Sequence, residues 1–275
     1  MHDAQTLPIL GRHNPRLLRL RRIAQRQEPD LTVADGLKLA ADLAVAGVPI
    51  VELFTVPERL DEVRKSPELR TVCEAGRAYL IDPATASNLA PTRQTQGVLA
   101  VVTIPLVHLG AEGVVIYLDG VQDPGNVGSV IRCAAAFGAA GVACSPECAD
   151  PFSPRALRAS AGHALLLPVE AGAAFEPLAE KTRLAGGEVA GTAGHGGVPL
   201  ARWRPRLPLL LALGNEGQGL SEEIRAACKR HVTVPLTGGV DSLNVAVTAG
   251  VILGSLAGVA GSPILDFRGH EGRPR

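Results

Sequence analysis

The stretch from Val114 to Phe137 decides the fold, and it reads VVIYLDGVQDPGNVGSVIRCAAAF. Its first residues are apolar and mostly β-branched or aromatic, which predicts a buried strand that ends at Leu118. A loop of glycine, aspartate and proline follows. From Asn126 onward apolar residues dominate at helical spacing, and we expect Asn126 to cap that helix, because asparagine side chains accept hydrogen bonds from a free first turn.

The same alternation of strand and helix patterns continues along the rest of the chain. The predicted strands are Val114–Leu118, Gly141–Cys144, Leu165–Val169, Glu188–Ala190, Leu209–Leu213 and His231–Val234. The predicted helices are Asn126–Phe137, Arg155–Ala161, Phe175–Leu184 and Ser221–Lys229. This alternation favours an α/β fold with a mostly parallel sheet and helices on both faces. In such sheets ligands bind beyond the carboxyl ends of the strands.

The last apolar stretch, from Leu243 to Ala260, is long enough to raise the question of a membrane span. Polar residues interrupt it, and glycine and alanine outnumber large apolar residues. Small residues stand four apart along it, at Ala246, Gly250, Gly254 and Gly258. Such a stripe lets another backbone approach closely. We therefore interpret it as a buried helix at a subunit contact and expect no membrane partner.

A length of 275 residues predicts one large domain or two modest ones. Residues 1–105 have the pattern of a small α/β unit, and we expect a second domain over 106–275. Within the first part we predict helices from Asn14-Pro15 and over Leu37–Ala46. The strands predicted there are Val48–Phe54, Tyr79–Ile81 and Gly97–Thr103.

The cysteine count and the N-terminus bear on the compartment. Five cysteines, an odd number, argue against a secreted disulfide framework. Cys144 and Cys148 lack a second pair at zinc spacing, so we expect no metal. The first residues include no apolar leader segment. A cytoplasmic protein is the resulting expectation.

A formal net charge of zero, from 27 basic and 27 acidic residues, hides an uneven distribution. Six arginines without an intervening acid fall within fifteen residues, at Arg12, Arg16, Arg19, Arg21, Arg22 and Arg26. Guanidinium groups bind phosphate oxygens in a bidentate manner, so this run indicates either a nucleic-acid contact or a solvated helix face.

Three loops after predicted strands carry candidate chemistry. The first loop lies between the strand that ends at Leu118 and the helix that begins near Asn126. Arg132 follows it inside that apolar helix, where it must reach a cleft, an acid or an anion. The second loop, Gly214–Leu220, has its glycines in the reverse order of a dinucleotide fingerprint, which argues against an oxidoreductase. In the third loop Ser242 and Asn244 are placed to cap the last helix, and Ser242 lacks the surroundings of a hydrolase nucleophile.

Taken together, these loops resemble the SpoU family of RNA ribose 2′-O-methyltransferases in the SPOUT superfamily. The matching motifs are N-x-G-x-x-x-R (Asn126, Gly128, Arg132), G-N-E-G-x-G-L (from Gly214) and P-L-x(5)-S-L-N-V (from Pro235). The likeness covers about residues 113–260. The N-terminal part more loosely resembles the substrate-binding domain of these enzymes, which has a ribosomal-protein-like RNA-binding fold.

The resemblance implies a trefoil knot in the C-terminal sheet, a homodimer, and S-adenosylmethionine as the cofactor. The residues implied to bind the cofactor are Thr192, Leu213, Gly214, Asn215, Gly217, Val234, Leu236, Ser242 and Leu243. The residues implied to act in catalysis are Arg132, Asn126, Glu216, Ser242 and Asn244. RNA contacts are expected at Arg12, Arg16, Arg19, Arg22, Arg155 and Arg158.

The implied reaction transfers a methyl group to a ribose 2′-hydroxyl of RNA. In this family, activation of the hydroxyl is attributed to the arginine that matches Arg132. Because arginine stays protonated, we favour a role in orienting phosphate and stabilising the developing alkoxide over that of a base. Asn126 and Glu216 would position Arg132 and the ribose, while Ser242 and Asn244 would hold the substrate.

A separate N-terminal domain favours 23S ribosomal RNA as the target over transfer RNA. The arginine-rich, lysine-poor composition is typical of a high-GC bacterium, in which some relatives modify ribosomal RNA to resist antibiotics. Three alternatives stay open: a tRNA 2′-O-methyltransferase, a non-catalytic RNA-binding protein with the same fold, and a nucleotide-dependent oxidoreductase.

Overall fold

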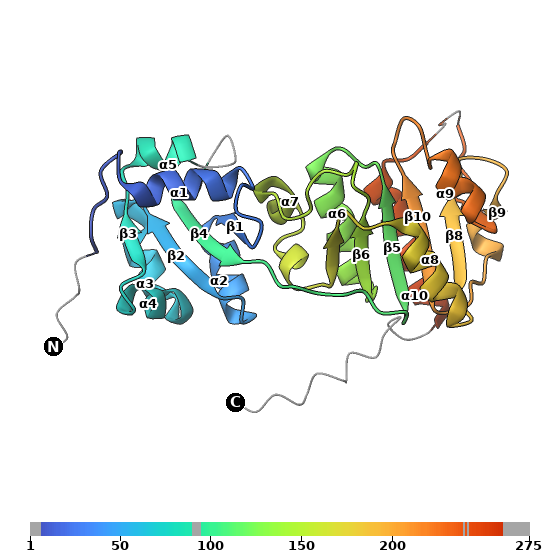
Figure 1. Ribbon diagram of the computed structural model, residues 1–275, viewed down its shortest axis with the longest axis horizontal. Helices are drawn as coiled ribbons and strands as arrows, with labels where there is room; N and C mark the ends of the chain where they lie inside the picture. The colour runs from blue at the N-terminus through green and yellow to red at the C-terminus, as the bar shows by residue number, and fades with distance from the viewer. Residues whose placement is uncertain (1–6, 90–94, 239, 241, 261–275) are drawn as a thin grey trace, which may run out of the picture. The chain divides into compact units, whose positions relative to one another are not determined.

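The computed structural model describes residues 7–89, 95–238, 240 and 242–260. The chain divides into two compact units, each drawn in Figure 1. The N-terminal unit comprises residues 1–106 and 152–166, and the C-terminal unit comprises residues 107–151 and 167–275. The segment 152–166 therefore departs from the single division between 105 and 106 that the sequence led us to expect.

Side-chain contacts explain why this segment belongs to the N-terminal unit. The buried Thr32 hydroxyl donates a hydrogen bond to the Phe152 carbonyl at 2.6 Å. Arg158 lies 3.9 Å from the Asp35 carboxylate, whose side chain is only 1% exposed. An acid buried that deeply needs a cation or donors nearby, and here a residue far along the chain supplies one.

The N-terminal unit is a four-stranded sheet in the order β1-β4-β2-β3. Only the β2–β3 pair is parallel. Its strands are β1 Leu31–Asp35, β2 Ile50–Thr55, β3 Ala78–Leu80 and β4 Val98–Thr103. Its helices are α1 Pro15–Ala24, α2 Leu37–Val45, α3 Leu60–Lys65, α4 Pro67–Glu74, α5 Pro83–Leu89 and α7 Pro154–Ala159, with 3₁₀ turns η1 Pro57–Arg59 and η2 His163–Leu165.

Helix α1 begins as the sequence predicts. The Asn14 side chain accepts the Arg16 N–H at 2.9 Å, and Pro15 occupies the first turn, where its missing N–H costs nothing. Leu17, Leu20 and Ile23 form its buried face and pack with residues of the sheet and α5 in one core. The arginines between them consequently face outward.

The C-terminal unit is a seven-stranded sheet in the order β7-β6-β5-β10-β8-β11-β9, and every pair in it is parallel. Its strands are β5 Val114–Asp119, β6 Gly141–Cys144, β7 Val169–Ala171, β8 Glu188–Thr192, β9 Val198–Pro199, β10 Leu209–Gly214 and β11 Arg230–Thr233. Its helices are α6 Pro124–Ala136, α8 Phe175–Leu184, α9 Glu222–Ala227 and α10 Val245–Ala260, with a 3₁₀ turn η3 Leu200–Arg202.

Helices cover both faces of this sheet, as the alternating pattern predicts. Phe175 and Ala179 of α8 and Ile224 of α9 share one core with Tyr117 and Leu210 of the strands. On β5 all six residues are buried, so its alternate side chains fill the opposite face as well. Helices α6 and α10 contact each other there, where the Cys133 thiol lies 3.8 Å from the Ala246 carbonyl.

Two local predictions were wrong. Helix α6 begins at Pro124 with Asp123 as its cap, because the Asp123 carboxylate accepts the N–H groups of Gly125 at 2.6 Å and Asn126 at 3.1 Å. This leaves the Asn126 side chain for other contacts. The strand predicted at 165–169 begins only at Val169, because Gly162, at φ 85°, starts the 3₁₀ turn η2.

The last helix confirms the interpretation of its apolar run as a packed helix. Ala249, Ile252 and Leu253 of α10 are buried in the C-terminal unit. Within the described part of the chain, no helix combines the length and the apolar character that a bilayer crossing requires.

Candidate functional site

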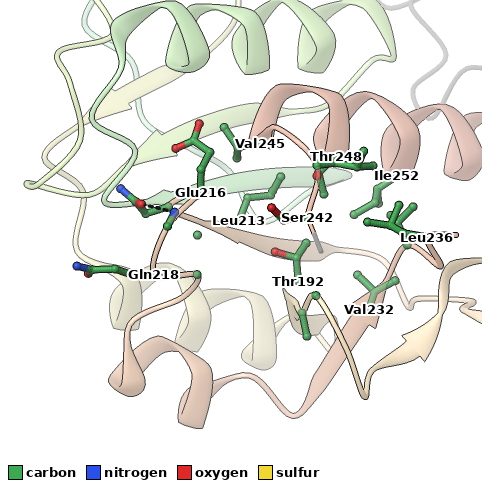
Figure 2. A pocket seen from close by; sticks show the side chains of 18 of the residues that line it. Thr192, Leu213, Glu216, Gln218, Val232, Leu236, Ser242, Val245, Thr248 and Ile252 are labelled. Carbon is green, nitrogen blue, oxygen red and sulfur yellow. Dashed lines mark hydrogen bonds between the residues drawn. The ribbon is translucent and has the colours of Figure 1, made fainter. Parts of the chain in front are cut away.

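A cavity of about 340 Å³ opens where β8, β10 and β11 end, at the carboxyl edge of the sheet (Figure 2). Figure 2 shows the apolar side chains of Val232, Leu236 and Ile252 gathered on one side and Glu216 and Gln218 toward the other. We call it the glycine-loop cavity; its lining comprises residues 192–194, 213–219, 225, 232, 234, 236, 242, 243, 245, 248 and 252.

The loop after β10 closes on itself and forms one wall of the cavity. Asn215 and Gly219 exchange two backbone hydrogen bonds, of 3.1 and 2.8 Å, and the Asn215 side chain accepts the Gly217 N–H at 2.8 Å. The Asn215 amide also donates to the Gly120 carbonyl at 2.8 Å, which ties the loop to the segment after β5. The loop is thereby pre-organised.

Glycine is required at Gly214 because another backbone approaches it. A Cβ atom there would lie 2.1 Å from the Gly219 carbonyl carbon and 2.3 Å from the Leu220 nitrogen. Gly219 has φ 72°, a conformation that side chains disfavour. By contrast, a Cβ atom at Gly217 would meet only the Asn215 side chain, at 3.5 Å.

All residues predicted to bind the cofactor line this cavity. They are Thr192, Leu213, Gly214, Asn215, Gly217, Val234, Leu236, Ser242 and Leu243. Sequence reasoning missed the wall that the first two turns of α10 provide, formed by Val245, Thr248 and Ile252. Their three- and four-residue spacing places them on one helix face, which is the pattern that would have identified them.

Three of the residues predicted to act in catalysis form one hydrogen-bonded chain. The Asn126 amide donates to the Glu216 carboxylate, and the Asn244 amide donates to the Asn126 carbonyl oxygen at 2.9 Å. Asn244 also caps α10, since its oxygen accepts the N–H of Ala246 at 2.8 Å. Glu216 itself lines the cavity, so the chain of bonds reaches the cavity wall.

The other two predicted catalytic residues lie differently. Ser242 lines the cavity and is exposed. Arg132 is exposed on α6 and lies outside the cavity lining. Among the described residues it has no hydrogen-bond or ion-pair partner, so the salt bridge considered from sequence is not found there.

The arginines predicted to contact RNA lie mostly beside acids from elsewhere in the N-terminal unit. Arg16 pairs with Glu52 and lies over the Tyr79 ring, 4.7 Å from its centroid. Arg19 and Arg22 both reach Glu28, at 3.0 and 3.5 Å. The hydrogen bond with Glu28 raises the pKa of Arg19.

The remaining members of that set are also exposed. Arg12 lies 4.0 Å from Asp82 with its side chain 73% exposed, and Arg158 pairs with Asp35. Arg155 is exposed on α7. The run that has no acid in sequence thus meets acids in space, while its guanidinium groups stay accessible from solvent.

Comparison with known proteins identifies the chain. The model of the SpoU rRNA methylase family matches residues 113–254. A tRNA/rRNA methyltransferase of Synechocystis is 34% identical over 199 residues, which are 69% of this chain and 71% of the relative. The 23S rRNA (guanosine(2553)-2′-O)-methyltransferase RlmP of Bacillus subtilis is 31% identical over 72% of this chain and 78% of its own length.

A solved structure agrees in both units. The SpoU methyltransferase AviRb from Streptomyces viridochromogenes, crystallised with S-adenosylmethionine, superposes with a TM-score of 0.77 at 27% identity. The match covers 91% of this chain and 99% of AviRb. The chain therefore belongs to the SpoU rRNA methylase family, and it is an S-adenosylmethionine-dependent RNA ribose 2′-O-methyltransferase.

Proposed function

We propose that the chain methylates a ribose 2′-hydroxyl of 23S ribosomal RNA. The observation that carries the proposal is the convergence at the wall of the glycine-loop cavity of Asn126 from the first turn of α6, Glu216 from the loop after β10 and Asn244 from the start of α10. The name of the Bacillus subtilis relative supports the ribosomal target. The N-terminal unit serves as the RNA substrate-binding domain and the C-terminal unit as the catalytic domain.

The glycine-loop cavity fits an adenosyl group in size and chemistry. Its volume of about 340 Å³ falls in the range of small-ligand sites. Apolar side chains of Leu213, Val232, Leu236 and Ile252 enclose it, and glycine-loop backbone groups offer polar contacts to an adenine edge. S-adenosylmethionine supplies a methyl group on a positively charged sulfur, which is already a good leaving group.

Arg132 acts on the RNA in this proposal. Its guanidinium is always protonated and, among the described residues, unpaired, so it is available to hold a phosphate beside the target ribose. The same positive charge stabilises negative charge as it develops on the 2′-oxygen, which loses its proton to solvent water as it takes the methyl group. Arg132→Lys tests the second of these roles, and a flat pH–rate profile with only weakened RNA binding would contradict any direct role of Arg132 in the chemical step.

The hydrogen-bonded chain fixes the geometry around that oxygen. Glu216 and Asn126 orient the ribose and the approaching arginine, while Ser242 and Asn244 hold the substrate backbone near the methyl donor. Alignment of this kind lowers the activation barrier by up to about 7–11 kcal/mol. The protein residues therefore act by positioning and charge, and the reaction calls for no metal.

A homodimer in the cytoplasm, with a trefoil knot in each catalytic domain, completes the proposal. Val247 and Val251 support the dimer, because they stand one turn apart on α10 and are 50% and 40% exposed. Gly250 and Gly254 do not belong to this exposed face, because they lie against Cys133 and Phe137 at the end of α6, so this part of the small-residue stripe expected at a subunit contact packs within the chain. The order of strands supports the knot, since β10 lies between β5 and β8.

Mapping of 2′-O-methyl groups in 23S rRNA tests the proposal. Ribosomal RNA from cells with and without this chain is compared, and one ribose methyl group is expected to depend on it. Transfer of tritiated methyl groups to the unmodified RNA in vitro supplies the direct assay. Methylation of tRNA alone, or RNA binding without transfer, would overturn the proposal. Growth of the same cells with ribosome-targeting antibiotics checks a role in resistance.

A further inference from the structure

A second cavity lies in the C-terminal unit, at the amino ends of β8 and β11. It measures about 570 Å³ and also borders the end of α8 and the segment before β10. We call it the basic cavity; its lining comprises Arg183, Gly186, Gly187, Glu188, Val189, Arg206, Lys229 and Arg230. The glycine-loop cavity lies at the other ends of the same strands.

Four cations and one acid line the basic cavity. The acid, Glu188, is already satisfied: its carboxylate accepts the Trp203 indole N–H at 3.0 Å and the Arg206 backbone N–H at 3.3 Å. It also lies 3.6 Å from Arg230, and its side chain is only 13% exposed. The carboxylate is therefore held in the wall and neutralises at most one of the cations.

Two of the cations are available to a ligand. The side chains of Arg206 and Lys229 are exposed and have no hydrogen-bond or ion-pair partner within the described part of the chain. Arg230 is 59% exposed even though it faces Glu188. Arg183 is bound by Glu176 at 2.6 Å and by the Ala227 carbonyl at 3.1 Å, so it adds charge at a fixed position.

This chemistry selects phosphate groups. Guanidinium and ammonium groups are the side chains that bind phosphate oxygens. The residues that line the basic cavity include no aromatic ring on which a base could stack. We propose that the basic cavity binds backbone phosphates of the RNA substrate, outside the site of methyl transfer.

The position of the cavity favours an RNA over a small phosphate compound. Strand β8 has five residues, so its two ends are about 13 Å apart. A structured RNA carries phosphates across such a distance and reaches both ends of the sheet at once. The proposal rests on the RNA methyltransferase function and extends the surface that holds the RNA.

The variant Arg206→Gln/Lys229→Gln tests the proposal against the control Lys181→Gln/Arg202→Gln. The control removes two exposed cations of the C-terminal unit that line neither cavity, so both variants change the net charge equally. Affinity for a 23S rRNA transcript is measured between about 50 and 200 mM salt. S-adenosylhomocysteine binding and thermal unfolding report on the fold and on the other cavity.

We expect the first variant to bind RNA roughly tenfold more weakly near 0.15 M salt. The slope of log affinity against log salt should fall by about 1.4–1.8, since two phosphate contacts are lost. S-adenosylhomocysteine affinity and the melting temperature should not change, and the control should bind RNA like the wild type.

Unchanged RNA affinity in the first variant would overturn the proposal, as would an equal loss in the control. Titration with pyrophosphate covers the remaining source of phosphate. Pyrophosphate binding that the variant loses, with RNA affinity intact, would assign the cavity to a small anion instead. The titrations are repeated with total tRNA. If the wild type does not methylate the 23S rRNA transcript, the proposed ribosomal target is wrong, and the tRNA titrations then test the basic cavity by themselves.

Discussion

Two pairs of arginines, one pair in each unit, differ in the partners that folding brings to them, while Arg183 and Arg230 of the C-terminal unit also face acids. In the N-terminal unit Arg16 and Arg19 meet Glu52 and Glu28, although no acid stands among the arginines in sequence. In the C-terminal unit Arg132 and Arg206 are exposed, and their side chains have no such partner among the described residues. The comparison shows that a run of basic residues is less informative than the acids that folding brings beside it.

The physical reason lies in the buried acids of the N-terminal unit. The Glu52 side chain is 8% exposed, and a carboxylate at that depth needs a cation or hydrogen-bond donors. Arg16 meets part of that need and is correspondingly less available to RNA. Exposed ion pairs contribute only about 0–1 kcal/mol, so the more accessible arginines, such as Arg12 and Arg22, can still exchange an acid for a phosphate.

The largest expected effect separates the unpaired arginine from the paired ones. Arg132→Ala should lower kcat for methyl transfer by roughly 100-fold or more, because a preorganised charge at the developing oxyanion is lost. Arg16→Ala should change kcat little and raise KM a few-fold. Steady-state assays with tritiated S-adenosylmethionine measure both. Equal effects of the two substitutions would erase the distinction between the units.

The next effect tests the rigidity of the glycine-loop cavity. Gly214→Ala places a methyl group 2.1 Å from the Gly219 backbone, so the loop must shift. We expect at least about tenfold weaker S-adenosylhomocysteine binding by calorimetry and a cost of about 1–3 kcal/mol in unfolding free energy. Gly217→Ala is the matched control for the unfolding free energy, since its Cβ finds ordinary contacts, although Gly217 itself lines the cavity. Comparable losses in both variants would show that the close approach at Gly214 is irrelevant.

A smaller effect separates two roles of Asn244. Asn244→Ala loses both the cap of α10 and the bond to Asn126, and should cost about 0.5–2 kcal/mol of unfolding free energy. Asn244→Ser restores a capping oxygen but not the amide donor. It should regain stability while kcat stays low, as measured by denaturant unfolding and methyl-transfer assays. Recovery of both properties in the serine variant would limit Asn244 to capping.

The smallest expected effect is a difference in thiol reactivity between one cysteine from each unit, and no change in methyl-transfer activity is involved. Burial raises the pKa of Cys73 in the N-terminal unit. In the C-terminal unit a hydrogen bond with Cys144, aided by Ser145 and the Val121 N–H, lowers the pKa of Cys148 to about 6 against the cost of burial. Iodoacetamide should therefore modify Cys148 before Cys73 at pH 7.

The sign of the pH dependence follows from that lowered value. The Cys148 thiolate should become half-populated as the pH rises through about 6, and alkylation, followed by mass spectrometry of peptides, should increase over that interval. Because the pKa is lowered in the folded chain, the associated stabilisation is present above the unfolded-state pKa and is lost as the pH falls through about 6. Denatured protein, with all cysteines exposed, is the control, and a midpoint above pH 8 in the folded chain would contradict the assignment.

Local sequence patterns predicted most of the C-terminal unit. Helix α8 has the predicted bounds, and β5 and β10 extend the predicted strands by a single residue. These elements carry dense apolar runs bounded by turn residues, which is where periodicity is most informative. The strand predicted over Leu165–Val169 was wrong at its start, because a short apolar stretch fits a strand or a packed turn equally well. Contacts within the N-terminal unit decide between the two.

The sequence predicted which residues form the candidate site, but not the hydrogen bonds between them. Motif spacing singled out Asn126, Glu216 and Asn244, which stand 90 and 118 residues apart where they bond. Sequence reasoning used Asn126 as a helix cap, whereas Asp123 takes that role and releases the Asn126 amide to join the other two. Hydrogen bonds between distant loops depend on the strand order, which local propensity does not encode.

The sequence alone determined the strand–helix alternation and singled out the glycines of the loop after β10 and the residues around them. These follow from backbone sterics and short-range burial, which act over a few residues. Only the tertiary structure decided which acids meet the N-terminal arginines, where segment 152–166 belongs, and that a basic cavity exists at the amino ends of β8 and β11. Charge and hydrogen-bond partners act through space, so their pairing is fixed only when the strand order brings distant segments side by side.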